Sequence, residues 1–319
     1  MTAAPLIAGF DAGQTHTSCR LAMLQRDGSW RQLAEGTGTG VSHLAAPGGE
    51  QRFRQALQSS LSAALQSAGL PLQRHLTAAA IGASGIEAGT TVQEQAVQLA
   101  AAAMGLAAAR VVVRGDEQTA LAGAFPSGAG ILVISGTGCI ALGRDAAGRQ
   151  HRCGGWGWLL DGAGSALDIG RDGLALSVQM ADGRLPETTL RRRLWQALAA
   201  ETPQQVKAAV VAESFGPAGF ARLAPLMDEL AGAGDRQALA VIERSAEALA
   251  AMVATVAAQL GLPQPPVCGS GGALRHLSQL RAAFAGALQR QAPGARLVQP
   301  AGDACEGALA LAAQAALRC

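Results

Sequence analysis

One pattern occurs twice along this chain: an apolar segment, a tight glycine-containing turn and a second apolar segment. The first copy occupies residues 6–28, and the second begins at residue 131, about 125 positions later. Short apolar runs joined through Asp-Gly or glycine-rich turns are typical of strands paired in a β-hairpin. Recurrence of the unit at this distance indicates a duplication, with one β-turn-β unit in each of two domains.

The segments that follow the first copy predict an α/β protein. Residues 51–68 carry apolar side chains at helical spacing and stop at Gly69, so they predict a helix. A second helix is expected at residues 91–104, between buried strands at residues 78–83 and 110–114.

The segments that follow the second copy predict a long helical region and a short return to strand. Residues 165–258 are expected to be almost entirely helical, with Asp235 as a helix N-cap. Strands are expected at residues 266–268 and 296–299, and a last helix at residues 303–317.

The length of 319 residues suits two domains of ordinary size. We expect the first domain at residues 1–118, with the C-terminal segment 303–319 as an optional part of it. The second domain is expected at residues 119–302, with a helical insertion.

Composition excludes several kinds of chemistry. Lys207 is the only lysine, and tyrosine is absent. A Walker-type phosphate loop needs a lysine after a glycine-rich run, and no such run precedes Lys207. A pyridoxal enzyme would depend on the same lysine, and a tyrosine acid or base is ruled out. The formal net charge is +2, so the chain is nearly balanced in charge and predicts no strongly basic surface. Neither nucleic acid nor an acidic membrane is therefore expected as a partner.

No two of the six cysteines are spaced as a Cys-x-x-Cys pair, so neither a zinc site nor an iron–sulfur site is predicted. No secretory signal precedes the first apolar strand, and no apolar run approaches membrane length. We therefore expect a reduced, cytoplasmic protein.

Three glycine-bearing turns, each directly after an apolar strand, are candidate phosphate sites. They span residues 11–17, 135–138 and 269–272. Glycine amides can approach a ligand closely, and neighbouring threonine hydroxyls add further donors. Because no lysine is available, the phosphate charge would be met by amides, hydroxyls and a divalent cation, for which Asp11 is the natural carboxylate, through water. One such turn also suits an ordinary hairpin, whereas three together favour a nucleotide site.

At these turns the chain resembles the sugar kinase, heat-shock protein and actin superfamily. Asp11-x-Gly13-x-Thr15-x-Thr17 is similar to its first phosphate hairpin, residues 136–138 to its second, and residues 267–272 to its adenosine segment. The resemblance implies an α/β fold of two actin-like (ribonuclease H-like) domains around a nucleotide cleft, and it implies ATP and magnesium as cofactors. The nucleotide contacts that it implies are Asp11, Gly13, Gln14, Thr15, Thr17, Gly136, Thr137, Gly138, Gly269, Gly271 and Gly272.

Within that superfamily, the stretch from Gly136 to Arg171 is similar to the BadF/BadG and N-acetylglucosamine kinase branch. The block Gly154-Gly155-Trp156-Gly157 is its most specific part, and the resemblance extends over about residues 7–309. It implies a kinase that phosphorylates the 6-hydroxyl of an amino sugar, with N-acetylglucosamine, glucosamine or N-acetylmuramic acid as the acceptor.

Asp116 is the predicted general base, because it follows the buried strand 110–114 and an acceptor hydroxyl must lose its proton as it attacks the γ-phosphorus. It also matches the strand-Asp-x-x-x-Ala-Leu pattern of this branch. Its alternative role is the N-cap of the next helix, and both roles can hold at once. Glu117 is either a fallback carboxylate or a favourable charge in the first helical turn.

The acceptor site is predicted from the same resemblance. Trp156 is expected to stack on a sugar face, with core packing as the alternative. Residues 161–165 read Asp-Gly-Ala-Gly-Ser where the family commonly has Gly-Asp-Glu-Gly-Ser, and Ser42-His43 stands where an Asn is common. Both departures concern the acceptor rather than ATP. The predicted acceptor contacts are Ser42, His43, Ser84, Gly85, Asp116, Gly155, Trp156 and Asp161.

Two other functions stay open. One is a BadF-type ATPase that activates a partner reductase, and the other is a sugar-sensing protein without catalysis. The expected partner is a small amino sugar, and a homodimer is left open.

Overall fold

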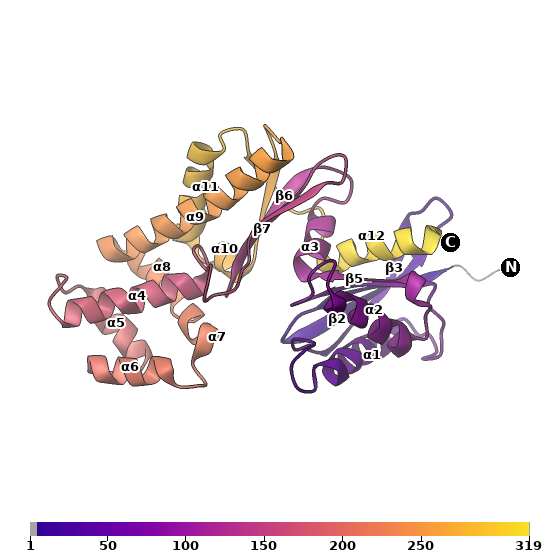
Figure 1. The fold of residues 1–319 in the computed structure, drawn as a ribbon, viewed down its shortest axis with the longest axis horizontal. Coiled ribbons are helices and arrows are strands. Elements are labelled where there is room, and N and C mark those ends of the chain that lie inside the picture. The colour runs from indigo at the N-terminus through magenta and orange to yellow at the C-terminus, as the bar shows by residue number, and fades with distance from the viewer. Residues whose placement is uncertain (1–4, 319) are drawn as a thin grey trace. The chain divides into compact units, whose positions relative to one another are not determined.

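The computed structural model describes residues 5–318 and divides into two compact units (Figure 1). The first unit comprises Met1–Ser127 and Pro300–Cys319, and the second comprises Gly128–Gln299. The chain therefore leaves the first unit once and returns to it at its C-terminal end. The boundary expected at residue 118 differs from this division, because it would cut through a helix that packs within the first unit.

The first unit is built on a five-stranded sheet of order β3-β2-β1-β4-β5. Strands β1, β4 and β5 are parallel, while β2 runs antiparallel to both β1 and β3. The carboxyl ends of β1, β3, β4 and β5 therefore lie at one edge of the sheet. The strands are β1 Leu6–Ala12, β2 His16–Leu24, β3 Trp30–Thr39, β4 Ala78–Ala83 and β5 Val111–Gly115.

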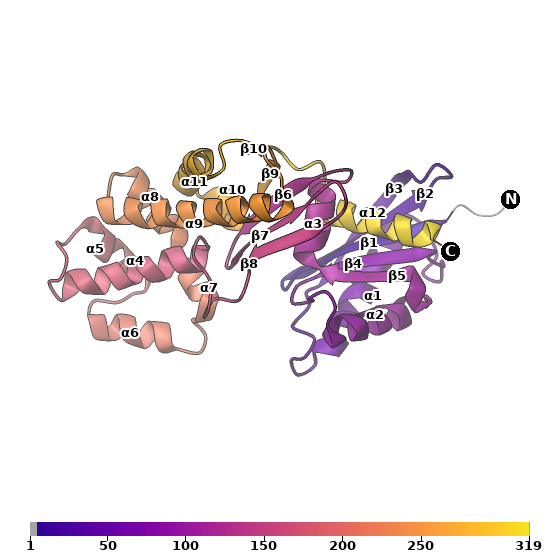
Figure 2. The same ribbon diagram turned by 45° about the horizontal axis from the view of Figure 1, so that its top comes forward.

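Helices cover both faces of this sheet (Figure 2). On one face, α1 and α2 bury a core that includes Phe10, Phe53 and Ile81. On the other face, α12 buries a smaller core that includes Ile7 and Leu309. The helical segments of this unit are α1 Gly49–Ser67, α2 Thr91–Met104, the short 3-10 turn η1 Ala108–Arg110, α3 Asp116–Ala124 and α12 Ala304–Leu317.

The backbone of helix α12 lies in close contact with the backbones of β1 and α3. A Cβ at Gly9 would lie 2.6 Å from the Leu309 nitrogen, and one at Gly307 would overlap the Thr119 carbonyl oxygen. A Cβ at Gly123 would likewise overlap the Asp303 carbonyl oxygen. Only glycine fits at such contacts, and alanine-rich helices suit the same short distances.

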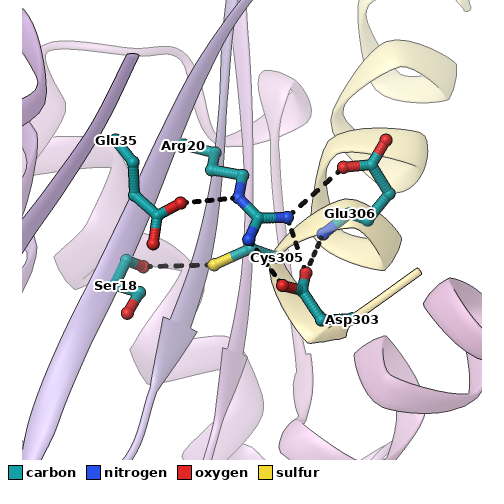
Figure 3. Close-up of polar contacts among 6 residues, drawn as sticks. All are labelled: Ser18, Arg20, Glu35, Asp303, Cys305 and Glu306. Atoms are coloured by element: carbon teal, nitrogen blue, oxygen red, sulfur yellow. Dashed lines mark hydrogen bonds and ion pairs between the residues drawn. The ribbon is translucent and has the colours of Figure 1, made fainter. Parts of the chain in front are cut away.

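A charge cluster around Arg20 fixes the start of α12 to the sheet (Figure 3). Both terminal nitrogens of Arg20 donate to the Asp303 carboxylate, at 2.7 and 2.5 Å, and its Nε donates to Glu35 at 2.9 Å. Glu306 lies 3.4 Å from the guanidinium as a third carboxylate. Burial alone would raise the pKa of Asp303, but the hydrogen bonds and charge of Arg20 hold it below its ordinary value. Asp303 also accepts the Glu306 amide at 3.0 Å and so caps α12.

The second unit carries a sheet of order β10-β9-β6-β7-β8, in which β6 is parallel to β9 and antiparallel to β7. Helix α9 packs on this sheet, where Gly143 leaves room for Val256. The strands are β6 Gly130–Ser135, β7 Cys139–Arg144, β8 Gln150–Gly154, β9 Pro266–Ser270 and β10 Arg296–Leu297. The helices are α4 Ala166–Ala181, α5 Thr189–Ala197, α6 Pro203–Val211, α7 Gly216–Ala221, α8 Ala224–Gly232, α9 Arg236–Leu260, α10 Gly272–His276 and α11 Ser278–Gln291.

Most of the predicted elements are present, and Asp235 caps α9 as expected through the amides of Gln237 and Ala238. The Asp-Gly turn at residues 27–28 indicates a second hairpin, whose outer strand is β3, but the sequence pattern predicts no bounds for β3 and does not predict β8. Both have polar sequences, and several positions of β3 are exposed, so neither shows a clean apolar alternation. Within residues 5–318, no helix combines the length and the apolar character needed to cross a membrane.

We expect Asp303→Ala to destabilise the protein more than Thr90→Ala, which removes only an N-cap contact in the same unit. The loss of a cap costs about 1 kcal/mol, and Asp303→Ala also leaves Arg20 without its bidentate partner. Urea unfolding of both variants measures the difference. Adding Arg20→Met to Asp303→Ala should cost little more, and equal losses for the two single variants would contradict this role of Arg20.

Candidate active site

Predicted site residues lie at or just after the ends of four strands, at one edge of the first sheet. Asp11 lies near the end of β1, His43 follows β3, Ser84 follows β4 and Asp116 follows β5. Backbone hydrogen bonds tie these segments together: the Ser84 amide donates to the Ala12 carbonyl at 3.3 Å. The edge is thus assembled entirely within the first unit.

The hairpin between β1 and β2 is closed by the Gly13 amide, which donates to the His16 carbonyl at 3.1 Å. Gln14, Thr15 and His16 are exposed. Thr17 departs from the prediction, because its side chain is fully buried and its Oγ1 finds no partner among residues 5–318. The burial of Thr17 follows from the alternation of side chains along β2, which places successive residues on opposite faces of the sheet.

Thr17 pairs with Ala12, whose side chain belongs to the core beneath α1, so Thr17 points into that core. Thr15 is therefore the exposed threonine hydroxyl of this hairpin.

Asp11 lies on the opposite face of the sheet, toward α12. Burial raises the pKa of its carboxyl above the ordinary value, and the negative charges of Asp116 and Asp303 raise it further. His16 and Arg20 act in the opposite direction. Burial and two nearby negative charges both disfavour the ionised form of Asp11. A hydrated divalent cation beside the carboxylate would offset both effects, so Asp11 suits such a cation.

Asp116 is the first residue of α3, and Gly115 occupies the cap position, so the N-cap alternative is wrong by one residue. Its Oδ1 accepts the Glu117 amide at 3.0 Å, and its backbone carbonyl accepts the Thr119 hydroxyl at 3.0 Å. The carboxylate is half-buried at the sheet edge. The Glu117 carboxylate instead folds back against Gly115, consistent with a first-turn charge.

The predicted acceptor residues of the first unit meet where two loops touch. The imidazole of His43 lies on the Cα of Gly85, where an added Cβ would come within 3.0 Å of the His43 Cδ2. Gly85 has a φ of +79°, a conformation that suits glycine. The neighbouring Ser42 Oγ is buried without a partner in the described part of the chain.

The two predicted nucleotide turns of the second unit are also neighbours. Strands β6 and β9 are parallel, and Gly271, at a φ of +88°, lies so close to Ser135 that a Cβ would overlap its carbonyl oxygen. The Ser135 hydroxyl donates to the Gly164 carbonyl at 2.6 Å, which secures the end of β6. The exposed residues of these turns are Thr137, Gly138, Gly269 and Gly272.

The Gly154–Gly157 loop carries an exposed aromatic ring. Trp156 is 62% exposed, so core packing, the alternative for this residue, is wrong. The Arg152 guanidinium carbon lies 4.9 Å from the ring centroid, a cation–π contact, and Arg152 Nε donates to the Gly154 carbonyl at 3.1 Å. The shifted Asp161 lies against the same loop: a Cβ on Gly154 would lie 3.4 Å from its Oδ2.

Sequence reasoning missed Arg20 and the role of Asp303 in the electrostatics around Asp11. The strand register offered one signal, because the pairing of Asp11 with Ser18 places Arg20, two residues on, on the same face as Asp11. Asp303 carried no such signal, since it lies 283 residues away from Arg20.

The raised pKa of Asp11 predicts a stability effect. A carboxyl that binds its proton more tightly in the folded state destabilises that state once it ionises. We expect Asp11→Asn to raise the thermal midpoint at pH 7 without nucleotide. The gain should vanish as the pH falls below 3.8, where the carboxyl is protonated in folded and unfolded chains alike.

Asp27→Asn is the matched control, because hydrogen bonds from Ser29 lower the pKa of that exposed carboxyl, and it should not stabilise the protein. A lower midpoint for Asp11→Asn than for the wild type at pH 7 would show that ionised Asp11 does not strain the fold.

Two kinases resemble the chain in sequence. It is 25% identical over 308 residues to an N-acetylmuramic acid/N-acetylglucosamine kinase of Clostridium acetobutylicum, covering 96% of this chain and 97% of that one. It is 30% identical over 191 residues to an N-acetyl-D-glucosamine kinase of Dictyostelium discoideum, covering 57% and 59%.

Solved structures agree with the fold. A proposed N-acetylglucosamine kinase from Chromobacterium violaceum superposes with a TM-score of 0.76 at 30% identity, covering 97% of this chain and 99% of that one. A ROK family glucokinase from Streptomyces griseus, solved with glucose and AMPPNP, gives a TM-score of 0.57 at 18% identity, covering 97% and 98%. The expected α/β fold with two actin-like domains is thereby confirmed, and the expected enzyme class, a sugar kinase, agrees with these relatives. The model of the BadF/BadG/BcrA/BcrD ATPase family matches residues 8–312, and the chain belongs to that family.

Proposed function

We propose that the protein transfers the γ-phosphoryl group of ATP to the 6-hydroxyl of an amino sugar, with N-acetylglucosamine or a close relative as the acceptor. One observation carries this proposal: Asp116, Asp11 and the Ser84–Gly85 and Ser42–His43 loops converge at one edge of the first sheet. A general base, a cation-holding carboxylate and an acceptor surface are the parts that phosphoryl transfer to a hydroxyl requires.

Asp116 is the proposed general base. Its carboxylate would accept the proton of the acceptor hydroxyl as that oxygen attacks the γ-phosphorus, and the ADP leaves with the bonding electrons of the broken P–O bond. The hydrogen bond from the Glu117 amide holds the carboxylate in one orientation and leaves its second oxygen for the acceptor.

The remaining residues would bind and orient the reactants. Asp11 is suited to hold magnesium through water, and the metal, when bound, neutralises phosphate charge. The exposed amides and hydroxyls of the glycine turns in each unit are the proposed phosphate contacts: no lysine is needed, because nests of amides bind anions. Trp156, on the Gly154–Gly157 loop, and Asp161, which lies against Gly154, are the proposed sugar contacts of the second unit.

We expect Asp116→Asn to lower the rate of sugar phosphorylation by about 10²–10⁴-fold, because the amide cannot accept the hydroxyl proton. ATP binding should stay nearly unchanged. Glu117→Gln is the matched control on the next residue and should retain most of the activity. A normal rate for Asp116→Asn would refute the assignment, and a large loss for Glu117→Gln alone would identify Glu117 as the base.

The acceptor can be identified by coupling ADP release to a panel of sugars. We expect release with N-acetylglucosamine or N-acetylmuramic acid to exceed that with glucose, and release without sugar to be slow, since turnover needs an acceptor hydroxyl at the site. ATP turnover that is independent of every sugar would instead favour the reductase-activating ATPase. Catalytically silent sugar binding would favour the sensor.

A further inference from the structure

We propose that Arg152 is a positioning residue for the acceptor: it holds the Gly154–Gly157 loop in one conformation and covers one face of the Trp156 ring, so that the sugar meets the other face. This inference rests on the proposed function, in which Trp156 is a sugar contact. Arg152 would act through the loop and the ring, and not on the transferred phosphoryl group.

The Gly154–Gly157 loop has few side chains of its own to hold its shape. Gly154, Gly155 and Gly157 have φ values of +79°, +77° and +89°, a region that favours glycine. Glycine loses more conformational freedom on ordering than any other residue, so such a loop needs contacts from outside to keep one conformation. Trp156 lies within this segment, and the direction of its ring depends on those contacts.

Arg152, on β8, contacts two successive peptide groups of the loop. Its Nε donates to the Gly154 carbonyl at 3.1 Å, and its Nη2 donates to the Gly155 carbonyl at 2.5 Å. A guanidinium is a planar, rigid fork, so donation to both carbonyls fixes the two peptide planes relative to β8. The packing here is close: a Cβ added to Gly155 would lie 2.9 Å from Nη2 of Arg152 and 2.9 Å from Cδ1 of Ile140.

Gly154 is also held by packing against α9 and against Asp161. A Cβ added to Gly154 would lie 2.9 Å from the Met252 sulfur and 3.4 Å from Oδ2 of Asp161. The start of the loop therefore has support besides Arg152. The part of the loop that depends most on Arg152 is Gly155–Trp156.

The same guanidinium covers one face of the Trp156 ring. The Cζ of Arg152 lies over the ring, 4.9 Å from its centroid, in a cation–π contact. Trp156 is still 62% exposed, and the face away from Arg152 is the one available for stacking. A large, rigid aromatic ring supplies contact area to a ligand, and it binds more tightly when its orientation is fixed beforehand.

The test measures steady-state kinetics of Arg152→Met, whose side chain can neither donate to the two carbonyls nor bind the ring as a cation. We expect KM for N-acetylglucosamine to rise about 10-fold, with a smaller change in kcat and an unchanged KM for ATP. Arg152→Lys should recover only part of this loss, because an ammonium keeps the charge but lacks the fork. An unchanged acceptor KM in Arg152→Met would overturn the inference, and Arg152→Lys replaces it if the methionine variant does not fold.

Arg149→Met is the matched control on the same hairpin. Arg149 pairs with Asp145 at 2.6 Å, and its side chain is 68% exposed. It precedes β8, at the end of the strand away from the Gly154–Gly157 loop, so the acceptor KM should stay at the wild-type value. An equal rise in both variants would mean that a weakened β7–β8 hairpin, and not the loop contact of Arg152, is responsible.

A double-mutant cycle separates positioning of the ring from general support of the fold. Trp156→Ala removes the ring through which Arg152 is proposed to act. Adding Arg152→Met to Trp156→Ala should therefore raise the acceptor KM further by less than about 2-fold. Losses that multiply independently would show that Arg152 does not act through Trp156, and would overturn the inference.

Calorimetric titration of N-acetylglucosamine in the presence of AMPPNP separates this inference from the proposed function. If the wild type transfers phosphate and Arg152→Met keeps the wild-type acceptor KM, the kinase proposal stands and the Arg152 inference fails. If the wild type binds the sugar without transferring phosphate, and Arg152→Met weakens that binding about 10-fold, the kinase proposal fails and the Arg152 inference stands. If the sugar does not bind, both fail.

Discussion

The packing of α12 on the first sheet is the constraint on which the rest of that unit depends. Gly9, Gly123 and Gly307 remove the side chains that would hold the C-terminal helix away from β1 and α3. The helix therefore approaches closely enough for Asp303, its N-cap, to reach Arg20 and to influence Asp11. The abundance of alanine and glycine in this chain is the compositional sign of such backbone contacts.

This arrangement concentrates negative charge. Burial raises the pKa of Asp11, the charges of Asp116 and Asp303 raise it further, and His16 and Arg20 lower it. A fold selected for stability alone would avoid that repulsion, whereas a site for a metal-bound polyphosphate needs it, because the cation is attracted by the same charge that destabilises the empty site. Stability and the proposed cation binding therefore oppose each other at Asp11.

The acceptor region departs from the family pattern at two places, and the structure gives each a local explanation. Asp161, displaced by one position in the sequence, still lies beside Gly154 in the Gly-Gly-Trp-Gly loop. His43 stands where an asparagine is common and is fixed by one backbone hydrogen bond and by contact with Gly85. Both departures of this chain from the family pattern thus fall in the proposed acceptor region, while its glycine turns keep that pattern.

The sequence by itself determined the two β-turn-β units, the helices near residues 51–68, 91–104 and 303–317, and the placement of Asp11 and Asp116 at strand ends, because apolar periodicity and glycine turns act over a few residues. Only the tertiary structure decided that Thr17 is buried, that Trp156 is exposed and that Arg20 pairs with Asp303 across 283 residues. For Thr17 and Arg20, the outcome depends on which face of β2 a distant helix covers, and no local pattern specifies that choice. For Trp156, in the loop after β8, it depends on whether another part of the fold covers that loop.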